Sequence, residues 1–251
     1  MENYGQAVLV VGRSGIGKTT SIRNLEHDKT LIIRGGKKNL SLFNWRNLYS
    51  DNKYVKGKGL IWSCEDFKEL SDVLDRLENT KNLPFKNIIF EDFHYYVQDV
   101  TFSDEENNRF TQFHNLGVDE AKSLRRIINL AYLKRKNVAI LWISNNPTKA
   151  EERGTIVFTG SKFIDEKFIV ESLFTTVLEV DIIDGKHCFK TNSTDSLRSL
   201  KSPIGLFDLY IDSDLNYVFD KLIKYDNGII EENKKEKELK ENIKEEEKEN
   251  K

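Results

Sequence analysis

The sequence predicts an α/β fold built around a mainly parallel β-sheet, and three patterns along its 251 residues support that prediction. Apolar runs without strict alternation, such as residues 138–143, are typical of strands buried on both faces. Helical patterns lie between these runs, which favours parallel strands joined by crossover helices. Towards the C-terminus, segments 176–183 and 186–191 flank Asp184-Gly185, a pair typical of a tight hairpin, so antiparallel strands should end the sheet.

The N-terminal part of the sequence predicts strands and helices in alternation. The apolar run 7–11 is followed by glycines and then by the helix-like segment 18–25, which indicates strand, loop and helix in that order. Residues 30–33 and 60–62 are expected to form further strands. Ser63-Cys64-Glu65-Asp66 has the form of a capping box and therefore predicts the start of a helix. The apolar face of that helix would consist of Phe67, Leu70, Val73, Leu74 and Leu77.

The central part predicts a buried strand at 88–90 that ends in two acids, and then a polar segment at 103–115. A well-patterned helix should follow this segment and lead to the strand at 138–143. Its apolar face would consist of Ala121, Leu124, Ile127, Ile128 and Ala131. A further helix is expected at 163–174.

We expect one domain over residues 1–227, followed by a charged tail at 228–251 that is either disordered or a fraying helix. The net charge is -2, and the tail contributes nine Glu and seven Lys, so the rest of the chain is balanced and gives no sign of nucleic-acid binding by bulk charge. No apolar stretch approaches the roughly 18 residues of a membrane span, and the N-terminus lacks a signal-peptide pattern. We therefore expect a cytoplasmic protein without a membrane partner.

A glycine-rich segment follows the first predicted strand and matches the Gly-x4-Gly-Lys-Thr pattern of a phosphate-binding loop (P-loop). Between a strand and a helix, the main-chain N–H groups of such a loop face phosphate oxygens, and side chains at its glycines would obstruct that approach. Lys18 should reach the β- and γ-phosphates of ATP, and the Thr19 hydroxyl should ligate Mg²⁺. The residues expected to bind the nucleotide are Gly12, Arg13, Ser14, Gly15, Ile16, Gly17, Lys18, Thr19 and Thr20.

Two acids, Glu91 and Asp92, end the predicted strand at 88–90. P-loop proteins need a carboxylate at such a position to hold the magnesium shell, and often a second one to orient the attacking water. We expect these acids to act as a pair, with either one serving the metal. After the next strand, Ser144 and Asn145 could sense the γ-phosphate, although Asn residues before a Pro also form turns.

Basic residues near aromatic ones are candidates for binding single-stranded DNA, although solvated lysine faces are expected everywhere in so charged a chain. The candidates are Arg34, Lys37, Lys38, Lys53, Lys56 and Lys58 beside Tyr54, and Arg125 and Arg126 near Lys134, Arg135 and Lys136.

From about Val8 to Phe219 the order of features resembles the phage-encoded AAA-type, RecA-like P-loop nucleotide-binding proteins, a group that includes single-strand annealing and recombination ATPases. The first residues that carry the resemblance are the P-loop segment through Arg23, the acids followed by Phe93, and Ala121-Lys122-Ser123-Leu124-Arg125. The later ones are Gly160-Ser161-Lys162-Phe163-Ile164-Asp165-Glu166-Lys167, Glu171-Ser172-Leu173-Phe174 and Lys201-Ser202-Pro203-Ile204-Gly205-Leu206-Phe207.

The resemblance implies a RecA-like three-layer sandwich, Mg²⁺-dependent ATP hydrolysis, a homo-oligomer, and action on single-stranded DNA in an infected bacterial host. It makes Lys162 or Lys201 a candidate cation that reaches the γ-phosphate of a neighbouring subunit. The sequence departs from the family at Glu91, where the first acid is usually Asp, and at Asn145-Asn146, where Ser-His is common. The catalytic residues expected on these grounds are Lys18, Glu91, Asp92, Asn145 and Lys162.

Two other functions remain open. The chain could be a nucleotide-switched binding module that recruits a replication protein through its tail. It could also be a small-molecule kinase, since similar loops serve nucleotide kinases, but Glu151-Glu152-Arg153 supplies only one arginine where a kinase lid needs several.

Overall fold

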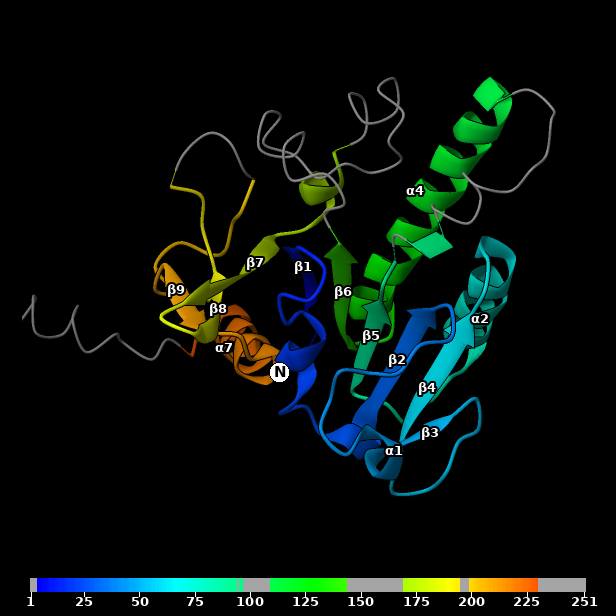
Figure 1. The fold of residues 1–251 in the computed structure, drawn as a ribbon, viewed down its shortest axis with the longest axis horizontal. Coiled ribbons are helices and arrows are strands. Elements are labelled where there is room, and N and C mark those ends of the chain that lie inside the picture. Colours follow the sequence, from blue (N-terminus) through cyan, green and yellow to red (C-terminus); the bar gives the residue numbers. More distant parts are fainter. Residues whose placement is uncertain (1–3, 94, 97–108, 144–168, 195–198, 230–251) are drawn as a thin grey trace, which may run out of the picture.

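The computed structural model describes residues 4–93, 95–96, 109–143, 169–194 and 199–229. These residues form an α/β fold with a mixed, mostly parallel nine-stranded sheet that ends in an antiparallel C-terminal hairpin, in the order β3-β4-β2-β5-β6-β1-β7-β8-β9 (Figure 1). All pairs from β3 to β7 are parallel, while β8 and β9 pair antiparallel. The strands are β1 (Ala7–Gly12), β2 (Thr30–Gly35), β3 (Tyr49–Asp51), β4 (Gly59–Cys64), β5 (Asn87–Glu91), β6 (Asn137–Ile143), β7 (Thr176–Ile183), β8 (Lys186–Lys190) and β9 (Tyr210–Asp212).

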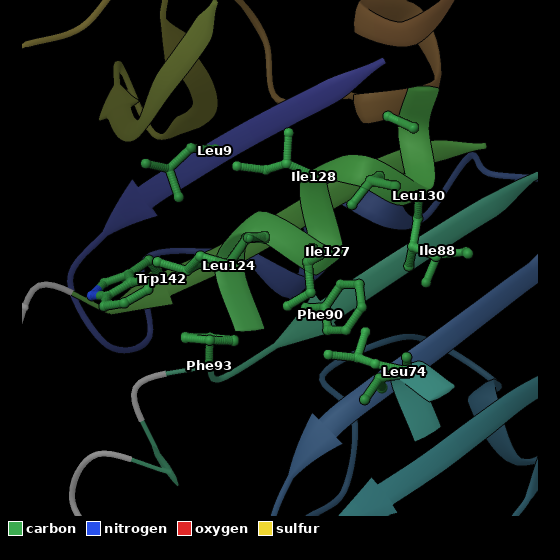
Figure 2. Packing of buried hydrophobic residues seen from close by; sticks show 14 of the residues in the cluster. Leu9, Leu74, Ile88, Phe90, Phe93, Leu124, Ile127, Ile128, Leu130 and Trp142 are labelled. Carbon is green, nitrogen blue, oxygen red and sulfur yellow. The ribbon is translucent and has the colours of Figure 1, made fainter. Parts of the chain in front are cut away.

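Helices cover both faces of the sheet, which explains why its central strands are apolar along their whole length. The α-helices are α1 (Trp45–Leu48), α2 (Phe67–Asn79), α4 (Arg109–Leu133) and α7 (Leu215–Asp226), and short 3₁₀ helices occur at η1 (Thr19–Ile22), η2 (His27–Lys29) and η3 (Val170–Leu173). In β1, Leu9 and Val11 join the cluster formed with α2 and α4, while Val8 and Val10 join the cluster formed with η1 and α7. Figure 2 shows the first cluster, in which Leu124 and Ile127 of α4 lie near Phe90, Phe93 and Trp142.

The expected strands at 7–11, 30–33, 60–62, 88–90, 138–143, 176–183 and 186–191 are all found, some of them one to three residues longer or shorter. The expected helix at 18–25 was wrong in type and length, because only the 3₁₀ helix η1 forms there. Its i→i+3 bonds run from Ser21 N to Lys18 O and from Arg23 N to Thr20 O, both at 3.1 Å. The Ser21 hydroxyl also donates to Lys18 O at 2.6 Å. A side chain that occupies this carbonyl disfavours a continuing α-helix.

Two helix starts also differ from the prediction. The N-cap of α2 is Asp66 and not Ser63, which belongs to β4. Asp66 accepts from Glu69 N at 2.7 Å, and Glu69 accepts from Glu65 N, one residue before the N-cap, at 2.8 Å, so a variant of the capping box begins three residues later. Helix α4 begins at Arg109, inside the expected polar segment.

The sequence interpretation missed α1, β3, β9 and α7. The expected helix at 163–174 is described only from residue 169, where η3 forms, and most of the charged tail lies outside the described residues. Among the residues that are described, no helix has the length and apolar character that crossing a membrane requires.

Candidate functional site

The glycine-rich loop (residues 12–19) leaves the carboxyl end of β1 and enters η1. Gly15 and Gly17 adopt φ values of 77° and 102°, a region that side chains other than glycine rarely occupy. A Cβ atom at Gly12 would lie 2.9 Å from Cγ2 of Ile16. The backbone conformation of Gly15 and Gly17 and the close contact at Gly12 explain why glycine is needed at these three positions.

The Lys18 side chain folds back over this loop and is buried. Its Nζ atom donates to the carbonyl oxygens of Gly12 at 3.0 Å and Arg13 at 2.7 Å. Burial lowers the pKa of Lys18 from 10.5 to about 8, although the charge of Asp92 acts in the opposite direction. The loop therefore holds a buried cation against its own carbonyl oxygens, and phosphate oxygens would stabilise that charge.

The acids lie at the end of β5, as predicted, and β6 separates this strand from β1. Glu91 is 2% exposed and accepts a hydrogen bond from the Thr19 hydroxyl, which connects the acid-bearing strand to the glycine-rich loop. Its other oxygen, Oε2, has no hydrogen-bond partner in the described part of the chain. Burial raises the pKa of Glu91, while the Thr19 hydrogen bond opposes the shift.

Asp92 follows in a left-handed conformation, with φ at 55°, which turns the chain away from β5. Its carboxylate forms an ion pair with Lys38, which lies in the loop after β2. The two acids thus differ in surroundings: Glu91 contacts the loop hydroxyl, and Asp92 contacts a lysine from another strand connection.

The oxygen donors of Thr19 and Glu91 fit a Mg²⁺ ion that is also bound by phosphate. They do not fit a metal ion held by protein side chains alone. No group of three or more His, Cys, Asp or Glu side chains within the described ranges could hold a metal ion. Mg²⁺ commonly takes only one or two protein carboxylates and completes its shell with water and phosphate oxygens. The Thr19 hydroxyl and the Glu91 carboxylate, whose Oε2 atom has no hydrogen-bond partner among the described residues, match that requirement.

One residue of the site was missed from the sequence. The hairpin β7–β8 extends past the end of β1, and His187 of β8 places Nδ1 2.9 Å from the main-chain oxygen of Ile16. A Cβ atom at Gly17 would lie only 2.7 Å from the same nitrogen, so the imidazole packs directly on the glycine-rich loop. No local pattern announces this role, because the contact joins residues 171 positions apart.

Asn145 and Lys162, together with Ser144, lie outside the described residues, so their predicted roles remain predictions. Lys201 is described and forms an isolated bridge with Val177, next to the start of β7. Val177 pairs with Leu9, three residues before the end of β1. This bridge places the main chain of Lys201 beside the start of β7, and the predicted contact of its side chain with a neighbouring subunit remains a prediction.

Several of the basic candidates for DNA binding have partners within the chain. Arg34 is buried and donates to Ser63 at 2.8 Å and to Asp51 at 3.1 Å, so its predicted role as an exposed DNA contact was wrong. Arg126 binds Glu78 and Asp75 of α2. Lys53 and Lys56 are exposed, as is Tyr54.

No protein-family model matches this sequence, and a search of curated proteins finds no match. The functional interpretation therefore depends on the geometry of the site.

Proposed function

We propose that this chain is an ATP-binding and hydrolysing P-loop protein with a RecA-like core, which acts on single-stranded DNA in phage recombination or replication. The observation that carries the nucleotide part is the hydrogen bond from Thr19 to Glu91. This bond joins Thr19, the last residue of the loop pattern, to Glu91 at the end of β5, although the two residues are 72 positions apart in the sequence.

The position of the site in the sheet supports the same proposal. In open α/β sheets, ligands bind outside the carboxyl ends of the strands. The glycine-rich loop, Glu91 and Asp92 all lie at the carboxyl ends of parallel strands, and β6 lies between β1 and β5. The residues that follow β6, including Asn145, are those expected to approach the terminal phosphate.

The roles of the residues follow from their contacts. The main-chain N–H groups of the loop would bind phosphate oxygens, and Lys18 would exchange its carbonyl partners for the β- and γ-phosphates. Thr19 and Glu91 would hold Mg²⁺, the first as a ligand and the second directly or through water. The ion supplies neutralisation of the negative charge that develops during phosphoryl transfer. Asp92 would orient the attacking water.

The DNA part of the proposal is carried by the resemblance and by the exposed basic residues around Tyr54. The alternative, a nucleotide-switched binding module, is favoured by the intramolecular partners of Arg34 and Arg126, which remove two cations from the DNA candidates. The kinase alternative concerns residues 151–153, outside the described part of the chain.

The test is steady-state ATP hydrolysis by the wild type, Lys18→Ala and the surface control Lys86→Ala, each with and without excess single-stranded DNA. Lys86 forms an exposed ion pair with Glu26 and lies away from the loop. We expect the Lys18 variant to lose at least about 100-fold in hydrolysis, as loss of a transition-state cation does, and the control to be unchanged. Wild-type hydrolysis should rise several-fold with DNA. Hydrolysis that depends on Lys18 but is indifferent to DNA would reject the DNA role and favour the switch.

A further inference from the structure

Lys38 occupies a position that the glycine-rich loop pattern does not account for. It follows β2, whose residue Arg34 pairs in register with Glu91 of β5. The loop that carries Lys38 therefore starts beside the acid-bearing strand end. Its ammonium group forms an ion pair with Asp92, while its side chain remains 54% exposed.

The main chain of this loop is fixed by a buried arginine. Arg34 donates to the carbonyl oxygen of Lys38, as well as to Ser63 and Asp51. Its side chain is only 4% exposed. A buried guanidinium with several acceptors holds its partners in a defined geometry. The main-chain position of Lys38 is thus built into the fold, while about half of its side chain is exposed.

Glycines at the start of the loop bring it against the segment that contains Asp92. A Cβ atom at Gly35 would lie 2.7 Å from Cβ of Tyr95 and 3.0 Å from the carbonyl oxygen of Asp92. Gly36 has a φ of 72°, and its added Cβ would lie 3.0 Å from the Tyr95 ring. Only glycine permits this close approach, so the sequence Gly35-Gly36 allows Lys38 to lie beside Asp92.

The charge of Lys38 acts on the phosphate-binding groups as well as on Asp92. Burial is the main reason for the lowered pKa of Lys18, and the positive charge of Lys38 lowers it further. Burial raises the pKa of Glu91, and Lys38 is among the charges that counteract this shift. Lys38 therefore lies within electrostatic range of both the loop lysine and the buried acid.

We propose that Lys38 is a second phosphate-binding lysine of this site, which leaves Asp92 and contacts the terminal phosphate of a bound nucleoside triphosphate. This proposal rests on the nucleotide binding proposed above. Phosphate oxygens next to Lys18 would offer Lys38 more negative charge than one carboxylate does. Its departure would release Asp92 to orient water only when a triphosphate is present. Lys38 would then distinguish a triphosphate from a diphosphate.

The adjacent Lys37 provides a matched control. It has the same charge and lies in the same loop, but it pairs with Glu65, beyond the end of β4, and its side chain is 70% exposed. If only the positive charge of the loop matters, replacing either lysine should lower the affinity for the triphosphate equally. If Lys38 contacts the terminal phosphate, only the replacement of Lys38 should lower it.

The experiment compares the wild type with Lys38→Ala, Lys38→Arg and Lys37→Ala. The affinities for Mg²⁺–ADP and for a non-hydrolysable Mg²⁺–ATP analogue are measured by calorimetry on the full chain. For Lys38→Ala we expect the affinity for the ATP analogue to fall about tenfold, the effect of one charge-assisted hydrogen bond. ADP affinity should change less than about twofold. Lys38→Arg should restore most of the preference, and Lys37→Ala should behave as the wild type.

Equal losses for both nucleotides, or no loss for either, would overturn the proposal. If Lys38→Ala fails to fold, Lys38→Arg and a Lys38→Gln variant give the same comparison. Binding of single-stranded DNA without nucleotide is measured in parallel, because DNA phosphates have the same chemistry. Weaker DNA binding with an unchanged ATP-to-ADP ratio would assign Lys38 to DNA and reject the proposal. If the wild type binds no nucleotide at all, the proposed function fails as well.

Discussion

The Nδ1 atom of His187 lies 2.9 Å from the main-chain oxygen of Ile16, so the C-terminal hairpin supports the glycine-rich loop from the side opposite the acids. Because a carbonyl oxygen can only accept, Nδ1 must carry a proton in this contact. The imidazole also fills the space above Gly17. The hairpin is therefore part of the site and not only an end of the sheet.

Replacing His187 by Ala should loosen the loop. We expect the free energy of unfolding to fall by about 1 kcal/mol, since one hydrogen bond of a half-buried group is lost. Nucleotide affinity should fall by a few-fold, because an unfixed loop must be ordered on binding. Urea unfolding and nucleotide titration measure the two effects. His187→Asn is the control, because its Nδ2 can replace Nδ1 as donor, and it should retain most of the stability and of the nucleotide affinity. Equal losses in the Asn and Ala variants would show that packing of the ring matters more than the hydrogen bond.

Glu91→Gln should separate stability from function. Burial raises the pKa of Glu91 in the folded protein, so the folded state binds more protons than the unfolded one between the ordinary pKa and the raised value. The wild type should therefore lose stability as the pH rises through this range, whereas the variant should not. Above it, we expect the variant to be more stable by about 1–3 kcal/mol and inactive in Mg²⁺-dependent hydrolysis.

The measurement is urea unfolding from pH 4 to pH 9 without metal or nucleotide, with the exposed Glu26→Gln as control. The Thr19 hydroxyl can still donate to the amide oxygen of Gln, so the comparison removes the charge and keeps the bond. A variant that is less stable than the wild type at every pH would contradict the assigned direction of the pKa shift.

Arg126 should stabilise the helix pair and contribute nothing to DNA binding. Its guanidinium donates to both carboxylate oxygens of Glu78, at 2.9 and 2.8 Å, to Asp75 at 2.5 Å and to Ser71 at 3.0 Å, which ties α4 to α2. We expect Arg126→Ala to lower the free energy of unfolding by about 1 kcal/mol, since the group is only partly buried. The exposed neighbour Arg125→Ala should cost about 0.5 kcal/mol or less. Any larger loss of single-stranded DNA binding in Arg126→Ala than in Arg125→Ala would return Arg126 to the DNA candidates.

The central strands and the glycine-rich loop could be predicted because their signals are local. Runs such as that in β6 must be buried on both faces, and the loop glycines have a fixed spacing. Helix α7 also had a usable signal that was overlooked: Asp214 is its N-cap, and Leu215, Val218, Phe219 and Leu222 are its buried face.

The contacts of His187 and Lys38 could not be predicted in the same way. Each depends on which strands become neighbours: β7 lies beside β1, and β2 lies beside β5. The periodicity of a segment shows that it forms a strand but does not determine its place in the sheet. For the same reason the burial of Arg34 could not be predicted. In the sequence it is one of many basic residues, and its partners Asp51 and Ser63 become neighbours only in the folded sheet.

The low pKa of Lys18 leads to a test of phosphate binding that needs no catalysis. In the nucleotide-free protein this pKa is about 8, so the amine is charged at pH 7 and mostly neutral at pH 9.5. Phosphate oxygens favour the charged form, so binding above pH 8 should take up a proton. Between pH 8.5 and 9.5 the affinity for a triphosphate should fall, by at most about tenfold per pH unit.

Calorimetry in buffers with different ionisation enthalpies measures this uptake directly. At pH 9 it should approach about one proton per nucleotide, and near pH 7.5 the contribution of Lys18 should be small. Lys18→Arg is the matched variant, because a guanidinium stays charged over the whole range. Nucleotide binding by that variant should take up no proton at pH 9.

The pH dependence of unfolding tests the direction of the Lys18 pKa shift independently. The folded protein binds fewer protons than the unfolded chain between pH 8 and 10.5, so Lys18 should make the free energy of unfolding rise over this range. Proton uptake that persists in Lys18→Arg would place the titrating group elsewhere in the site.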